Sequence, residues 1–241
     1  MPRYYNKDPI ANVICRMQFI PSFDWDATLT GLIYSEMKAS FPTKRRAIIA
    51  QGPGIEMNAP DNIQLWREDE RAYAQVGPNQ LTVVHIAPYS GWEDYVPLIE
   101  SALAAYRKVA EPTGLQRVGL RYVNRIVFDE PLVQLDKWFE YLIKKPDTVA
   151  DQLNGMVSFA AISQYAFDDG RVLLTQQLAS GGSDPTEGAI CLLDLDCSTT
   201  QPEVVHLNDV TTWLDNTHTI IKQAFESSIK LELRERFDPI G

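Results

Sequence analysis

The same order of predicted elements (a strand, a helix, several consecutive strands and a second helix) occurs twice along this chain. In the first half, residues 12–20 show the alternating pattern of a half-buried strand, and residues 92–109 show the apolar spacing of a helix. In the second half, we predict a long strand over residues 115–128 and the longest helix over residues 209–236. Because runs of consecutive strands favour antiparallel pairing, the order predicts an α+β fold with a mostly antiparallel, curved sheet packed against helices.

The repeated order divides the chain into two similar β-α-β-β-β-α lobes, residues 1–114 and 115–241, which we expect to form one compact unit. Residue identity between the two halves is weak, so the internal duplication is inferred from the pattern of elements alone. The helix over residues 209–236 would be about 40 Å long at about 1.5 Å per residue. A shorter helix over residues 132–144 would follow the long strand.

The chain is acidic, with 32 acidic and 22 basic residues, a net charge of −10 and a pI near 4.8. Residues 1–114 hold 13 acids and 11 bases, a net charge of −2, whereas residues 115–241 hold 19 acids and 11 bases, a net charge of −8. This balance disfavours a general nucleic-acid binder or a binder of anionic membranes, because both need a basic surface. Nucleic-acid binding would need Lys44, Arg45 and Arg46 on one surface with the arginine-bearing strand over residues 117–126.

Three cysteines are too few, and odd in number, for a disulfide framework, which indicates a reducing compartment. The first residues lack the apolar core of a signal peptide, and no apolar run approaches the roughly 18–20 residues of a transmembrane helix. We therefore expect a cytoplasmic protein. Neither the cysteines nor the three histidines have metal-site spacing, so no metal or cofactor is expected. Cys191 and Cys197 lie on one strand face with leucines and are predicted to be buried thiols.

The most unusual segment covers residues 117–126, where Arg117, Arg121 and Arg125 share one face of a predicted strand. One hypothesis is an anion site for phosphate or carboxylate, because a guanidinium group binds both in a bidentate manner. Gly119 lies on the same face and would leave room for a ligand or another backbone to approach closely.

Asp194 and Asp196 support the alternative interpretation, an ion-pair ladder across neighbouring strands. Both carboxylates would lie on one face of a strand over residues 190–197 and could neutralise the arginines. The same two carboxylates could begin a site for a hard metal ion, but no third or fourth ligand is evident.

The segment over residues 88–95 joins a strand to a helix and carries several aromatic residues. Ser90 and Glu93 have the spacing of a capping box at the start of that helix. Its aromatic side chains would either stack on a ligand or pack against the sheet. No catalytic set is identified, and the candidate ligand-binding residues are Arg117, Arg121, Arg125, Tyr122, Tyr89 and Trp92.

Five segments, residues 9–15, 75–81, 88–92, 119–126 and 224–229, resemble a sporadically distributed bacterial family whose function is not established. They include the sequences QVGPNQL, PYSGW and GLRYVNRI and span nearly the whole chain. The resemblance implies no catalytic residues. The scattered distribution of that family implies accessory or mobile gene content, such as a defence system.

Two functions follow as hypotheses. The first is a non-enzymatic interaction or sensing protein with a protein partner, either a basic one attracted to residues 115–241 or a second copy of the chain. The alternative is a binder of a small anion, or an enzyme, with a pocket between the lobes. That pocket would be lined by Arg117, Arg121 and Arg125 together with Tyr122 and Tyr89.

Overall fold

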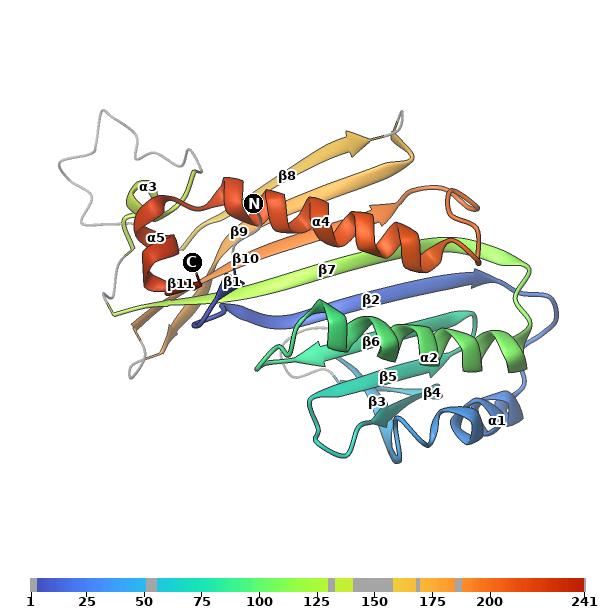
Figure 1. Cartoon of the computed structure of the whole chain (residues 1–241). Coiled ribbons are helices and arrows are strands. Elements are labelled where there is room, and N and C mark those ends of the chain that lie inside the picture. The colour runs from blue at the N-terminus through green and yellow to red at the C-terminus, as the bar shows by residue number, and fades with distance from the viewer. Residues whose placement is uncertain are drawn as a thin grey trace.

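The computed structural model has α+β architecture, with helices on one face of a large curved sheet (Figure 1). The structure describes residues 4–50, 56–129, 133–140, 158–167, 170–184 and 188–240. Within these ranges, nine strands form the antiparallel sheet, in the order β3-β4-β5-β6-β2-β7-β10-β9-β8. The expected antiparallel, curved α+β architecture is therefore confirmed.

The strands of the large sheet are β2 (Ile10–Ile20), β3 (Thr43–Ala50), β4 (Glu56–Trp66), β5 (Ala72–Gly77), β6 (Gln80–Ile86), β7 (Gly114–Phe128), β8 (Ala160–Phe167), β9 (Val172–Asp184) and β10 (Gly188–Thr199). Two short strands, β1 (Tyr4–Tyr5) and β11 (Pro239–Ile240), pair separately and bring the two ends of the described chain together. Strands β2 and β7 lie side by side at the centre of the large sheet. Each has as its other neighbour a strand from its own half of the chain, β6 beside β2 and β10 beside β7.

The helices are α1 (Ala27–Met37), α2 (Trp92–Ala110), α3 (Leu135–Trp138), α4 (Val210–Ser228) and α5 (Leu231–Arg236). Helices α1, α2 and α4 lie over the same face of the sheet, which we call the helix-covered face (Figure 1). The opposite face is called the helix-free face. Within the described ranges, no helix is both long and apolar enough to cross a membrane.

A tyrosine from α2 connects this helix to the backbone of the sheet. The Tyr95 hydroxyl donates a hydrogen bond to the Val83 carbonyl oxygen at 2.6 Å and accepts one from the Cys15 N–H at 2.9 Å. Tyr95 is fully buried, so these bonds form away from water. The hydroxyl therefore joins α2 to both β6 and β2 at the centre of the core.

The expected single helix over residues 209–236 is wrong, because the chain leaves the helical path after Ser228. Ile229 is extended and forms a β-bridge with Phe139. The Lys230 N–H donates to the Trp138 carbonyl oxygen at 2.9 Å. These backbone bonds to the last residue of α3 and to the residue after it replace the next turn of α4, and α5 begins as a separate helix. Of the helix expected over residues 132–144, the described residues 133–140 form only the single turn of α3, and residues 132 and 141–144 lie outside the described part of the chain.

The side chains of β7 alternate between the two faces of the sheet. Those of Val118, Leu120, Tyr122, Asn124 and Ile126 are buried on the helix-covered face. The three arginines of the strand lie on the helix-free face. One strand thus supplies residues to two separate surfaces.

Candidate functional site

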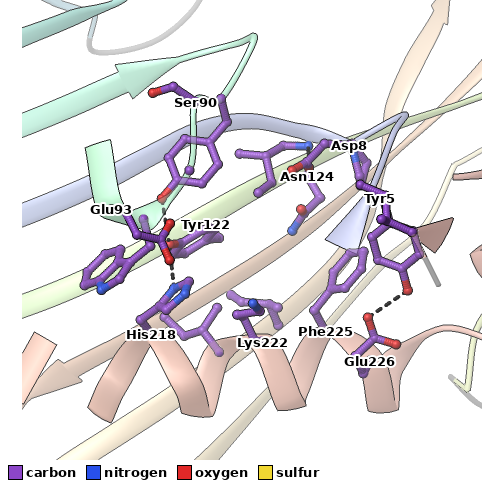
Figure 2. A pocket seen from close by; sticks show the side chains of 18 residues that line it. Tyr5, Asp8, Ser90, Glu93, Tyr122, Asn124, His218, Lys222, Phe225 and Glu226 are labelled. Atoms are coloured by element: carbon purple, nitrogen blue, oxygen red, sulfur yellow. Dashed lines mark hydrogen bonds between the residues drawn. The ribbon is translucent and has the colours of Figure 1, made fainter. Parts of the chain in front are cut away.

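A pocket of about 250 Å³ lies on the helix-covered face, between the beginning of α2 and the side of α4 (Figure 2). Four parts of the chain meet around it: the segment before β2, the β6–α2 connection, the strands β7 and β10, and α4. The first two parts belong to residues 1–114 and the last two to residues 115–241. The pocket therefore lies where the two halves of the chain meet.

Three side chains form a hydrogen-bonded chain along one wall of the pocket. The Tyr89 and Tyr122 hydroxyl oxygens are 3.3 Å apart, and the Tyr122 hydroxyl lies 2.8 Å from Nδ1 of His218 (Figure 2). Tyr89 comes from the β6–α2 connection, Tyr122 from β7 and His218 from α4. The chain of hydrogen bonds thus joins three elements that are distant in sequence.

Trp92, the first residue of α2, connects that helix to α4. Its ring stacks on the imidazole of His218, with the ring centroids 4.4 Å apart and the planes 3° from parallel. Its Nε1–H donates to the Asp215 carboxylate at 2.8 Å. Stacking and hydrogen bonding together position Trp92 against α4 at the edge of the pocket.

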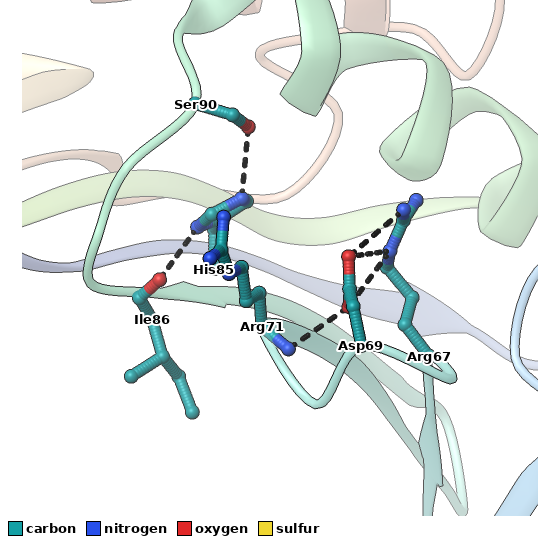
Figure 3. Close-up of polar contacts among 6 residues, drawn as sticks. All are labelled: Arg67, Asp69, Arg71, His85, Ile86 and Ser90. Atoms are coloured by element: carbon teal, nitrogen blue, oxygen red, sulfur yellow. Dashed lines mark hydrogen bonds and ion pairs between the residues drawn. The ribbon is translucent and has the colours of Figure 1, made fainter.

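His85 and Ser90 hold the connection that carries Tyr89 and Trp92 (Figure 3). Nδ1 of His85 lies 2.9 Å from the Ile86 carbonyl oxygen, which can only accept, so Nδ1 carries the proton. Burial lowers the pKa of His85, so the ring is neutral and Nε2 accepts from the Ser90 hydroxyl at 3.0 Å. The expected capping box at Ser90 is wrong, because α2 begins at Trp92 and the residue that caps it is Gly91, one position after Ser90.

Asn124 places an amide group against the floor of the pocket. The residue is only 2% exposed, and its Nδ2 donates to the Leu193 carbonyl oxygen at 3.0 Å. Its side-chain oxygen receives no hydrogen bond from the residues that the structure describes. Figure 2 shows the side chain pointing into the pocket between Tyr122 and Tyr5. The floor therefore offers a hydrogen-bond acceptor whose protein partner is missing among the described residues.

Charged groups lie around the rim of the pocket. The carboxylate of Glu226 accepts from the Tyr5 hydroxyl at 2.7 Å and from Nε of Arg234 at 3.1 Å. Burial raises the pKa of Asp8, while the Lys222 ammonium lowers it by attraction. With Glu93, three carboxylates and one ammonium group line the pocket. The rim is therefore more attractive to a cation than to an anion.

The titratable groups in the wall of the pocket have pKa values that burial moves away from neutral pH. Burial lowers the pKa of His218 to about 4, with a further lowering by Lys222, so the imidazole is uncharged at pH 7. Burial raises the pKa values of Tyr89 and Tyr122 above those of ordinary phenols. The wall consequently presents neutral rings and hydroxyl groups.

The structure separates the six predicted site residues into two groups. Tyr89, Trp92 and Tyr122 meet at the pocket. Arg117, Arg121 and Arg125 lie on the opposite face of the sheet, so these arginines and tyrosines do not share a pocket.

Arg121 forms the predicted ion pair across neighbouring strands. Nε of Arg121 donates to the two oxygens of Asp194 at 2.8 and 3.0 Å, and one of its terminal nitrogens also bonds this carboxylate. Arg117 instead donates to the Ser198 hydroxyl at 2.7 Å. Arg125 lies further along the same face, where its backbone N–H donates to the Pro9 carbonyl oxygen at 2.8 Å.

The cysteines lie in the core, as predicted for Cys191 and Cys197. Burial raises the pKa values of Cys15, Cys191 and Cys197 to about 12, so the thiols are protonated at neutral pH. Within the described ranges, no group of three or more His, Cys, Asp or Glu side chains is arranged to hold a metal ion.

No protein-family model matches the chain, and no curated protein matches it. Among solved structures, one described as Methanococcus jannaschii TBP aligns with 90% of this chain and 99% of that chain, at 9% identity and a TM-score of 0.27. A likeness at this TM-score supports no conclusion about fold or function.

Proposed function

We propose that this chain is a non-enzymatic sensing protein that binds a small, largely apolar molecule in the pocket between α2 and α4. The molecule would be neutral or cationic and would donate a hydrogen bond. The side-chain oxygen of Asn124 carries this proposal, because it faces the pocket without a protein partner among the described residues, and a bound donor would supply one.

The size and walls of the pocket support a ligand built around one ring. An apolar cavity of about 150 Å³ is enough to hold benzene, and this pocket has a volume of about 250 Å³. Trp92, Tyr122 and Phe225 supply aromatic surface beside a few polar groups, the usual composition of a small-molecule site. The three carboxylates of the rim disfavour an anionic ligand, which departs from the small anion considered on sequence grounds.

The shifted pKa values support binding rather than acid–base catalysis. A general acid or base works best with a pKa near the operating pH. His218, with a pKa of about 4, and the two tyrosines, with raised pKa values, all lie away from that range. Their hydrogen-bonded chain would instead orient the wall of the pocket for recognition.

We also propose that the two halves of the chain arose by duplication, with the pocket formed at their junction. The order of the sheet supports this, because β2 and β7 are neighbours and each is flanked by a late strand of its own half. A ligand between α2 and α4 would touch both halves and could change how they pack. A protein partner that binds only one of these packing arrangements would be basic, because residues 115–241 carry a net charge of −8.

Ligand-observed NMR with four probes of similar shape tests the proposal. Phenol is a neutral donor, benzylamine a cationic donor, toluene lacks a donor and benzoate is an anion. We expect phenol or benzylamine to bind, and we expect its affinity to stay the same when the buffer anion is changed. Toluene and benzoate should bind at least tenfold more weakly. Binding of none of the four, or tightest binding of benzoate, would refute the proposed ligand class.

A further inference from the structure

The helix-free face contains a second hollow, of about 60 Å³, at the centre of the sheet. Gly119 of β7 lies at its floor, in register with Arg16 on β2 and with Ser198 on β10. Arg117 and Arg121 follow two residues to either side of Gly119 on the same strand face. The volume of the hollow is well above the roughly 10–15 Å³ that a cavity needs to hold one water molecule, which leaves room for a small oxyanion.

Glycine at position 119 allows this close arrangement. A Cβ atom there would lie 2.9 Å from Cβ of Ser198 and 3.6 Å from Oδ1 of Asp196. The first distance is shorter than real Cβ contacts, so a side chain at 119 would push β10 groups away and fill the floor. The absence of a side chain keeps both the hollow and its neighbours in place.

The charged groups around the hollow are only partly paired with one another. Asp194 engages Arg121, and Arg117 donates through one nitrogen to Ser198. The guanidinium group of Arg16 lines the hollow and makes no hydrogen bond or ion pair with the described residues. The carboxylate of Asp196 also lines the hollow and accepts no hydrogen bond from the described residues. Three guanidinium groups and two carboxylates leave one positive charge in excess.

We propose that this hollow binds a protonated phosphate group, either inorganic phosphate or the phosphomonoester of a small molecule. Arg16 and Arg117 would donate to the phosphate oxygens, as guanidinium groups do in phosphate sites. Asp196 would accept a hydrogen bond from the P–OH group. Sulfate and phosphodiesters carry no proton at neutral pH, so the Asp196 carboxylate would repel them. The site is separate from the pocket on the helix-covered face and does not depend on the function proposed for it.

Isothermal titration calorimetry with inorganic phosphate, sulfate, dimethyl phosphate and glycerol phosphate tests this site. The full chain should bind inorganic phosphate or glycerol phosphate with one site per chain, and sulfate and dimethyl phosphate at least tenfold more weakly. The tighter of the two binders identifies free phosphate or a phosphomonoester as the source. Absence of saturable binding by both, or equal binding of sulfate, would overturn the proposal.

Three variants assign the binding to the hollow. Arg16→Gln should weaken phosphate binding at least tenfold, because it removes an exposed guanidinium without disturbing the core. Asp196→Asn should bring sulfate and phosphate affinities within about threefold of each other, since an amide no longer repels an unprotonated anion. Arg45→Gln, on β3, removes the same charge far from the hollow and should change neither affinity. Equal loss in Arg45→Gln and Arg16→Gln would show a nonspecific charge effect and refute the site.

Discussion

Acidification tests the environment of His218 and, through it, the wall of the pocket. Burial lowers the pKa of His218 to about 4 from an ordinary 6.5. Lys222 lowers it further, while Glu93 and Asp215 act in the opposite direction. Because the unfolded chain takes up this proton more readily than the folded one, the contribution of neutral His218 is complete above pH 6.5 and is lost as the pH falls toward 4.

The size of the effect follows from the two pKa values. For a single group with pKa values of about 4 folded and 6.5 unfolded, the free energy of unfolding falls by about 2.5 kcal/mol between pH 7.5 and pH 4.5. Other groups titrate in the same interval, so the wild-type curve alone does not isolate His218. His218→Asn removes the titration and keeps a polar atom near Nδ1 for Tyr122.

Urea denaturation at several pH values provides the comparison. The wild-type protein should lose about 2.5 kcal/mol more than His218→Asn between pH 7.5 and 4.5. His206→Asn, which replaces an exposed histidine, should follow the wild-type curve. Parallel curves for wild type and His218→Asn would refute the buried, neutral state of His218. A larger loss of unfolding free energy in His218→Asn than in the wild type would also contradict the lowered pKa of His218.

Three further predictions concern the fold. Asp26→Ala should lower the midpoint of urea denaturation, because the carboxylate caps α1 by accepting from the Thr28 N–H at 2.7 Å; an unchanged midpoint would contradict this cap. Tyr95→Phe should lower the free energy of unfolding by about 1–3 kcal/mol in the same measurement, because two buried backbone groups lose their hydrogen-bond partner. An unchanged free energy of unfolding would contradict the contribution of these two hydrogen bonds. The three cysteines should resist iodoacetamide in the native protein and all react in urea, as mass spectrometry can count; rapid native labelling would contradict their burial.

Patterns confined to one element predicted much of the fold. The alternation of residues 12–20 and 115–128 matches β2 and β7, and the apolar spacing after Trp92 matches α2 within one residue. Contacts between distant segments were not predictable in this way. The helix expected over residues 209–236 breaks because Ile229 pairs with Phe139, a partner 90 positions away in the chain whose pairing leaves no local signal.

The site was predicted only in part, for the same reason. Tyr89, Trp92 and Tyr122 were selected as aromatic residues near a helix start and a charged strand, and they do line the pocket. His218 was not selected, because its role comes from α4 crossing above β7. Asn124 did carry a local signal, since a polar residue among the apolar side chains of one strand face is expected to be buried.

The affinity of Asn124→Leu for the small donor probes tests the central claim most directly. Leucine has a similar size but offers no acceptor, and urea denaturation would confirm that the variant folds. Gln177→Leu, on the helix-free face opposite Asp194, provides a matched amide replacement away from the pocket. We predict that phenol or benzylamine binds at least tenfold more weakly to Asn124→Leu, while Gln177→Leu binds like the wild type. Unchanged affinity in a folded Asn124→Leu variant would contradict the claim that this oxygen recognises the ligand.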